Sequence, residues 1–316
     1  DTVIIAAGQL TDPDSFVPSG SDDLEIVGAG AEQTILTSSA AANVFVVNLS
    51  LGSRTVTMRD LQIRVPANFP DNQGAAVQAT GATFERVVLE SRNAGTQTAL
   101  VSPSGSTFRG GEIRGAAGGT WSSAVRPSGS NPSPLTIEDT TISDAATGVS
   151  VTASPVPVVV RRTRIAGTTA IGVSVQNGGA ATVEQSVITP QAGTALLAFS
   201  NAAGASSLSA DHVTIIGAAG NASPALRAET ANAAGAGAST LTVRNAIIRN
   251  YATTVQRSAP VSGTIGNATI ALSYANTAVV GASTGDGAIT HTAVTNADPL
   301  FASATDLRLL PGSASI

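Results

Sequence analysis

The chain has 316 residues, a formal net charge of −5 and no cysteine, so neither disulfides nor thiolate metal sites are available. All 16 basic residues are arginine, and they are interspersed with the acidic residues, which argues against nucleic-acid binding. No apolar run approaches the roughly 20 residues of a membrane span, and no signal peptide opens the chain.

A short segment recurs along the sequence, with a Thr-like residue, an apolar residue, four further residues and then Ile or Leu. Its copies begin at Thr57, Thr83, Thr107, Thr136, Val159, Thr182, Ser209 and Thr242, at intervals of 23 to 33 residues. Repeats of this length indicate one elongated solenoid rather than two domains.

Each copy predicts two short strands joined by a one-residue turn, which points both apolar positions inward. A third strand follows each copy, in segments such as Ala76-Val77-Gln78 and Ala195-Leu196-Leu197. No hairpin signal separates these strands, so equivalent strands are expected to stack in parallel. The sequence therefore predicts an all-β, right-handed parallel β-helix of about ten coils with three short strands per coil.

The whole chain, residues 1–316, is expected to form one domain. We assign residues 1–50 to the first coils, residues 51–255 to the regular coils, and residues 256–316 to the last coil and a C-terminal cap.

Segments at both ends resemble a known superfamily. Leu24-Glu25-Ile26-Val27-Gly28-Ala29-Gly30-Ala31 is similar to the opening coils of secreted bacterial right-handed β-helix repeat proteins of the pectate-lyase-like superfamily. Asp298-Pro299-Leu300-Phe301 and the segment Pro311 to Ile316 are similar to their closing segment. The resemblance implies the fold, but it matches no specific enzyme family. The superfamily mixes lyases, glycosidases, epimerases and non-catalytic surface proteins.

Alignment of the copies places charged residues of alternating sign in one external column. These residues are Arg59, Glu85, Arg109, Glu138, Arg161, Glu184, Asp211 and Arg244. The next column begins with Asp60 and Arg86 and continues through Asp139 and Arg162. We interpret both columns as ion-pair ladders that fix the register of the coils.

The alternation breaks at Glu184 and Asp211, with His212 adjacent, and these are the catalytic candidates. Two stacked carboxylates are what a retaining glycosidase uses, one pKa being raised by its neighbour. Asp139, Arg161, Arg162 and Arg164 are candidates for binding an anionic polysaccharide. Trp121 and Arg126 are further candidates, because an indole can stack on a sugar ring; the alternative is that Trp121 covers the end of a coil.

No metal site is predicted, and Ca²⁺ is expected only if the protein is a lyase. The sequence thus favours a secreted or cell-surface protein that contacts polysaccharide, with any export signal already removed. A polysaccharide lyase or glycoside hydrolase acting on an acidic polysaccharide is one alternative, and a non-catalytic structural or adhesion module is another. The oligomeric state does not follow from the sequence.

Overall fold

The repeating unit of this chain is a pair of short strands joined at a corner. One residue with a left-handed backbone conformation forms each corner. Asp139, with a φ of 50°, separates β15 (Leu135–Glu138) from β16 (Thr141–Ile142). The corner lets Ile137 and Ile142 both point into the core, where each is 0% exposed. Strand alternation and a one-residue corner therefore account for apolar residues five positions apart, as predicted from the sequence.

The structure is a computed structural model that describes residues 1–18, 22–39, 45–49, 55–67, 69, 75–94, 97–116, 118–129, 132–231, 235–261, 266–278, 280–303, 306–313 and 315. Within these residues the regular structure consists of 30 strands. The same residues contain no helix long and apolar enough to cross a membrane.

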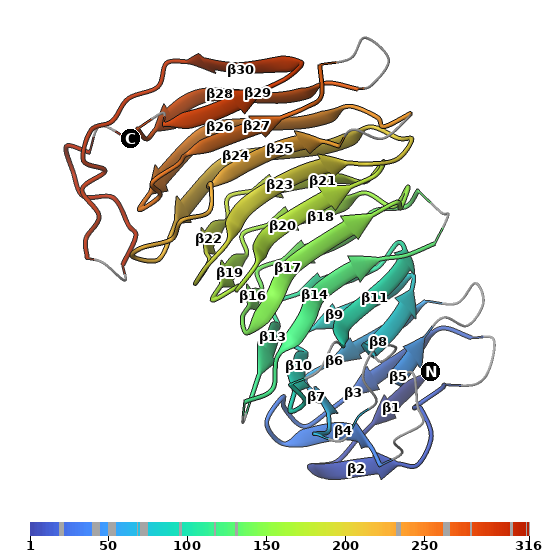
Figure 1. Cartoon of the computed structure of the whole chain (residues 1–316). Coiled ribbons are helices and arrows are strands. Elements are labelled where there is room, and N and C mark those ends of the chain that lie inside the picture. Colours follow the sequence, from blue (N-terminus) through green and yellow to red (C-terminus); the bar gives the residue numbers. More distant parts are fainter. Residues whose placement is uncertain are drawn as a thin grey trace.

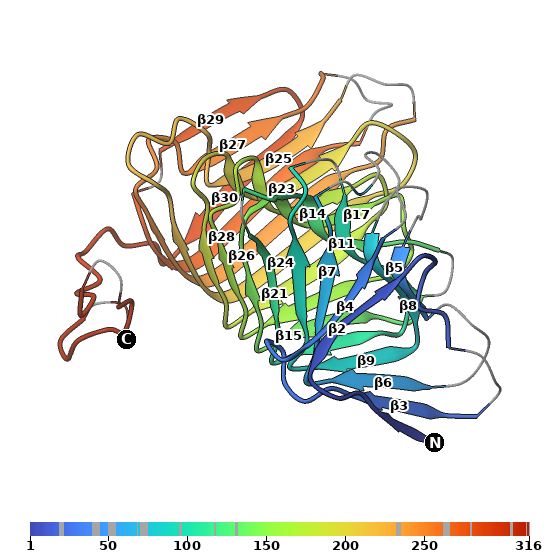
Figure 2. The ribbon, with the colours of Figure 1, turned by 90° about the horizontal axis from the view of Figure 1, so that it is seen from below.

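The strands form two parallel sheets, of 20 and 10 strands (Figures 1 and 2). Strands that precede the corners in the larger sheet are β1 (Thr2–Ile4), β3 (Leu24–Val27), β6 (Val56–Arg59), β9 (Ala82–Glu85), β12 (Thr107–Arg109), β15, β18 (Val158–Arg161) and β21 (Ala180–Glu184). Strands that follow the corners are β2 (Gly8–Asp12), β4 (Thr34–Ser38), β7 (Gln62–Val65), β10 (Val88–Ser91), β13 (Glu112–Gly115), β16, β19 (Arg164–Ala166) and β22 (Val187–Thr189).

In the later coils of the larger sheet, one strand runs through the corner. These strands are β24 (Ser206–Ile216), β26 (Ser239–Arg249) and β28 (Ala268–Asn276), and β30 (Gly287–Thr292) follows them. The 10-stranded sheet consists of β5 (Phe45–Leu49), β8 (Ala75–Thr80), β11 (Thr98–Ser104), β14 (Trp121–Pro127), β17 (Ala145–Thr152), β20 (Ile171–Gln176), β23 (Thr194–Ser200), β25 (Leu226–Thr230), β27 (Val255–Ser258) and β29 (Gly281–Thr284).

The register of the coils is the one predicted from the repeat. Thr57 pairs with Thr83, and the matching first positions pair in turn up to Ser209 with Thr242. The long intervals before Ser209 and Thr242 therefore do not disturb the alignment. The chain forms a right-handed parallel β-helix with three strands per coil, and the predicted fold class is confirmed.

The core is a stack of thin layers of Val, Ile, Leu and Ala, with few aromatic residues. Phe84 and Phe108 lie on adjacent coils, with ring centroids 5.9 Å apart. Arg257 interrupts this apolar stack near the C-terminal end, because it occupies an inward position on β27 and is 5% exposed. Its guanidinium donates to the Asp286 carbonyl at 2.7 Å and to the Gly285 carbonyl at 3.0 Å.

The C-terminal segment leaves the solenoid after β30 and folds beside it. We call the described residues of 297–313 the C-terminal flap; Phe301 and Leu309 form an antiparallel bridge within it. At its base, Arg249 donates to the Ala297 carbonyl, and just beyond it the Asn276 amide donates to the Ser315 hydroxyl. Figures 1 and 2 show the flap standing off the solenoid.

Candidate functional site

The predicted external charge column forms ion pairs between successive coils. Nε of Arg161 lies 2.6 Å from Oε2 of Glu138, and Nη2 of Arg244 lies 2.9 Å from Oδ2 of Asp211. Arg109 pairs with Glu85 in the same way. The interpretation of this column as a ladder of ion pairs is therefore confirmed at these three steps.

The second column coincides with the left-handed corners, and we call it the corner column. Its members are Asp60, Arg86, Gly110, Asp139, Arg162, Gln185, His212, Asn245, Tyr274 and, after β30, Ala293, with φ between 47° and 62°. A left-handed backbone turns these side chains away from the core. The sequence alone does not reveal this conformation, because most residues in the column are neither Gly nor Asn.

Three of the candidate polysaccharide-binding residues are engaged within the two columns. Nε and Nη2 of Arg162 donate to the two carboxylate oxygens of Asp139 at 2.7 and 2.9 Å, and Arg161 binds Glu138. The Arg162 hydrogen bond holds the pKa of Asp139 below its ordinary value, and Asp139 raises that of Arg162. Arg161, Arg162 and Asp139 therefore already have strong partners in the protein.

The catalytic candidates Glu184 and Asp211 occupy directly paired positions on β21 and β24, as predicted. The Asp211 carboxylate has further polar partners besides Arg244. Nδ2 of Asn245 donates to its Oδ1 at 2.8 Å, and Nδ1 of His212 lies 3.0 Å from the same oxygen. Glu184 is exposed, and its carboxylate has no hydrogen-bond or ionic partner among the described residues. The two carboxylates thus lie in different environments.

The pKa of Asp211 argues against its use as a proton donor. Desolvation raises this pKa, but hydrogen bonds from Asn245 and Arg244 and the nearby His212 outweigh it, so the pKa lies below its ordinary value. A glycosidase acid requires the opposite shift. Asp211 is therefore suited to holding its neighbours in place as a carboxylate.

Trp121 and Arg126 do not share a binding surface. Trp121 is 1% exposed, and its Nε1 donates to the Arg114 carbonyl at 2.9 Å. The ring is therefore part of the core, where it is not accessible for stacking on a sugar; its burial agrees with the alternative that it covers the end of a coil. Arg126 is exposed on β14, in the 10-stranded sheet.

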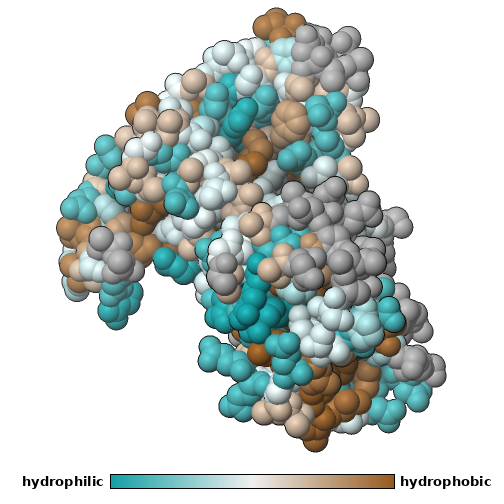
Figure 3. All heavy atoms as spheres, turned by 60° about the horizontal axis from the view of Figure 1, so that its bottom comes forward, coloured by the Kyte–Doolittle hydropathy of each residue, from teal (hydrophilic) through white to brown (hydrophobic). Residues whose placement is uncertain are grey.

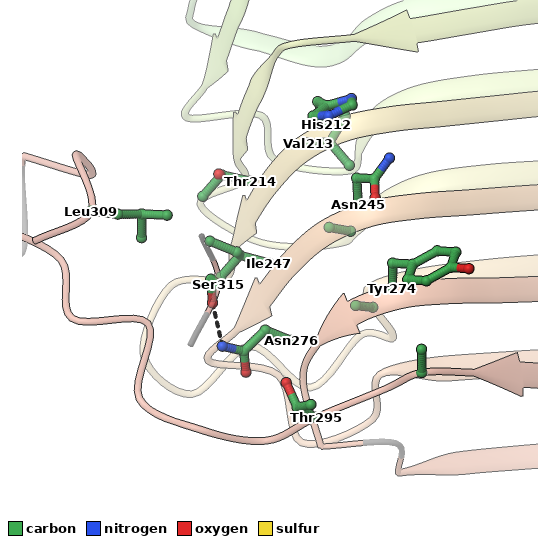
Figure 4. A pocket seen from close by; sticks show the side chains of 13 residues that line it. His212, Val213, Thr214, Asn245, Ile247, Tyr274, Asn276, Thr295, Leu309 and Ser315 are labelled. Atoms are coloured by element: carbon green, nitrogen blue, oxygen red, sulfur yellow. Dashed lines mark hydrogen bonds between the residues drawn. The ribbon is translucent and has the colours of Figure 1, made fainter. Parts of the chain in front are cut away.

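A large cavity lies where the corner column meets the C-terminal flap. It has a volume of about 590 Å³. His212, Asn245 and Tyr274 lie on three successive coils at its edge, and Leu309 faces them from the flap (Figure 4). Asp, Glu and Arg are absent from its described lining residues.

Tyr274 is the residue of this cavity that sequence reasoning missed. It has a φ of 50° and is 66% exposed, so a bulky ring occupies a strained backbone position without being buried. Such strain is a common mark of functional positions. The signal was available in principle, because Tyr274 follows Asn245 in the corner column, but its copy begins with Ala271 where most copies have Thr.

Two smaller cavities continue from this one beneath the flap. They measure about 410 and 310 Å³. The first and third cavities share Thr214, and the second and third share Leu307. We treat the three as one groove, bounded by β19, β22, β24, β26 and β28 on the solenoid side; Figure 3 shows the flap as a lobe beside the body.

A metal site was not predicted, and the sequence allowed Ca²⁺ only for a lyase. Among the described residues, no three or more His, Asp or Glu side chains gather in a way that could hold an ion. Apart from Glu184, the carboxylates of the two columns form ion pairs with arginines instead. These residues therefore do not fit a Ca²⁺ ion, and no step of a reaction is assigned to one.

The chain is similar in fold to two catalytic domains of known structure. The catalytic domain of the GH87 α-1,3-glucanase in complex with nigerose has 13% identity and a TM-score of 0.56 over 92% of this chain. The Agl-KA catalytic domain has 13% identity and a TM-score of 0.53 over 91% of this chain. This chain spans 60% and 62% of those two domains. The sequence matches no protein-family model and no curated protein.

Proposed function

We propose that this protein contacts polysaccharide through the groove beneath the C-terminal flap. The observation that carries the proposal is the row of His212, Asn245 and Tyr274 along the edge of the 590 Å³ cavity. Aromatic rings pack against the apolar faces of sugars, and amides and hydroxyls bond sugar hydroxyl groups. A similar fold that binds nigerose adds support for a glycan ligand.

The geometry of the row suits a linear polymer. Parallel coils repeat at about 4.8 Å, which is close to the length of one pyranose unit in an extended glycan. Successive corner residues would therefore meet successive sugars. Thr214, Asn276 and Ser315 add hydroxyl and amide groups along the same cavity.

The test is glycan binding by the Tyr274→Ala variant. We expect at least about a tenfold loss of affinity for a soluble neutral glucan, measured by affinity electrophoresis, because one aromatic platform is removed. Phe199→Ala is the matched control, since Phe199 is a half-buried aromatic residue on β23 in the opposite sheet. Equal retardation of both variants and the unmodified protein would refute the proposal.

A second candidate is that the same groove is the active site of a polysaccharide lyase or glycoside hydrolase. The contact between Nδ1 of His212 and Asp211 favours it, because a carboxylate that orients a histidine leaves the second ring nitrogen free to accept a proton. The test is product release from pectin, alginate and α-glucans by the unmodified protein and by His212→Asn. Absence of unsaturated or reducing ends from every polymer would leave the binding proposal alone.

A polysaccharide ligand also implies a place outside the cell or at its surface. This part of the proposal is tested by fractionating the producing cells and locating the protein with an antibody. Its recovery only with cytosolic proteins would count against it.

A further inference from the structure

The arginines of this chain are almost all engaged by partners within the protein. Arg64 and Arg114 bind the buried carboxylate of Glu90, and Arg249 donates to main-chain carbonyls. Among the described arginines, only Arg126 and Arg164 have a guanidinium group without a hydrogen bond or ion pair. Arg126 lies away from the groove, whereas Arg164 lines its 310 Å³ end.

The neighbours of Arg164 do not neutralise it. On the adjacent coils its paired positions are Thr141 and Val187, neither of which carries a charge. Asp306 lies in the same cavity, but both of its carboxylate oxygens accept hydrogen bonds from Nε of Arg308, at 2.9 and 3.0 Å. The Arg308 contacts also hold the pKa of Asp306 below its ordinary value, so Asp306 stays ionised and paired with Arg308.

The groove therefore changes in character along its length. The end at Tyr274 is lined by uncharged groups and His212, and the other end carries the unpaired guanidinium of Arg164. Four coils separate these two residues, a distance of roughly 19 Å along the axis. An extended oligosaccharide of a few units would reach from one end to the other.

We infer that Arg164 is a specificity residue that binds an anionic substituent, a carboxylate or a sulfate, on a glycan chain whose uncharged sugars lie toward Tyr274. This inference rests on the proposed function of the groove. A planar guanidinium matches both groups through paired hydrogen bonds. The ligand class is thus a polysaccharide with acidic groups, held at one end by charge and at the other by stacking.

The experiment compares two pairs of polymers that share a backbone: polygalacturonate with its methyl ester, and dextran sulfate with dextran. For Arg164→Gln we expect about a tenfold loss of affinity for an acidic member, a weaker salt dependence, and unchanged binding of the neutral member. Arg126→Gln is the matched control, because Arg126 is also exposed and unpaired. The pair in which the effect occurs distinguishes carboxylate from sulfate.

Two results would overturn the inference. If Arg164→Gln bound every acidic polymer as tightly as the unmodified protein, Arg164 would have no part in recognition, while a loss of neutral-glucan binding in Tyr274→Ala would still uphold the groove. If no polymer were bound at all, both the groove and the Arg164 subsite would fail together.

Discussion

Asp211 and Arg244 stand one coil apart in the same external column, and Nη2 of the arginine donates to Oδ2 of the aspartate at 2.9 Å. Asn245, the next residue along the chain, donates to the other carboxylate oxygen at 2.8 Å. One carboxylate thus joins the charge column to the corner column. The residues that fix the register are therefore the same ones that hold the edge of the groove.

Glu138 and Glu184 occupy equivalent positions two coils apart and offer a matched pair of substitutions. The Glu138 side chain is 10% exposed and accepts hydrogen bonds from Arg161 and Arg162 at 2.6 and 3.2 Å. We expect Glu138→Gln to lower the free energy of unfolding by about 2 kcal/mol, because charge-assisted hydrogen bonds are weakened. Glu184→Gln should change it by less than about 0.5 kcal/mol. Urea unfolding measures both, and similar losses would contradict the ladder.

The corner carboxylates predict a loss of stability in acid. Hydrogen bonds from Arg86 and Arg162 hold the pKa values of Asp60 and Asp139 below the ordinary value of 3.8. The unfolded chain therefore binds these protons more readily, so the stabilisation is complete above pH 3.8 and disappears as the pH falls through the folded pKa values.

Thermal unfolding followed from about pH 7 to pH 2 should show this decline in the melting temperature. The Asp60→Asn and Asp139→Asn double variant should be less stable at neutral pH and should decline less steeply. A double variant with the same slope as the unmodified protein would place the acid sensitivity elsewhere.

We expect the Tyr274 side chain to lower the stability of the protein while it strengthens glycan binding. Glycine adopts a positive φ without the steric cost that a tyrosine meets, so Tyr274→Gly should raise the free energy of unfolding by roughly 1 kcal/mol. The same change should weaken glycan binding by at least about tenfold, as in Tyr274→Ala, because the ring is lost. Calorimetry and affinity electrophoresis on one preparation check both effects. A variant that is destabilised would show that the ring contributes more by packing than the corner costs.

We expect substitution of Arg257 to destabilise the solenoid locally, at its C-terminal end. Arg257→Met keeps much of the side-chain volume but removes the donors to the Gly285 and Asp286 carbonyls, at a cost of about 2 kcal/mol. Amide hydrogen exchange should accelerate in β27 and β29 more than in β15. Arg227→Met is the control, because Arg227 lies on the outward side of the same sheet. Uniform acceleration along the solenoid would contradict a local role.

The fold was predictable because its information is local. Each copy carries its own inward residues, and the intervals between copies set the stacking, so the pairing of Ser209 with Thr242 follows from the sequence alone. The sequence left Trp121 open between stacking on a sugar and covering the end of a coil, and the structure shows that the ring is buried. The groove was hidden, because the C-terminal flap contacts coils far away in sequence; Leu309 meets the same cavity as His212.

One consequence of the one-residue corner concerns how such a protein acquires new ligands. The corner side chains point away from the core, so the core places no demand on their size, and the column holds Asp, Arg, Gly, Gln, His, Asn and Tyr at equivalent positions. A substitution there changes what the surface offers at intervals of about 4.8 Å and leaves the hydrophobic layers untouched. In this solenoid the inward residues determine the shape, and the corner residue of each coil determines which ligand groups that coil can contact.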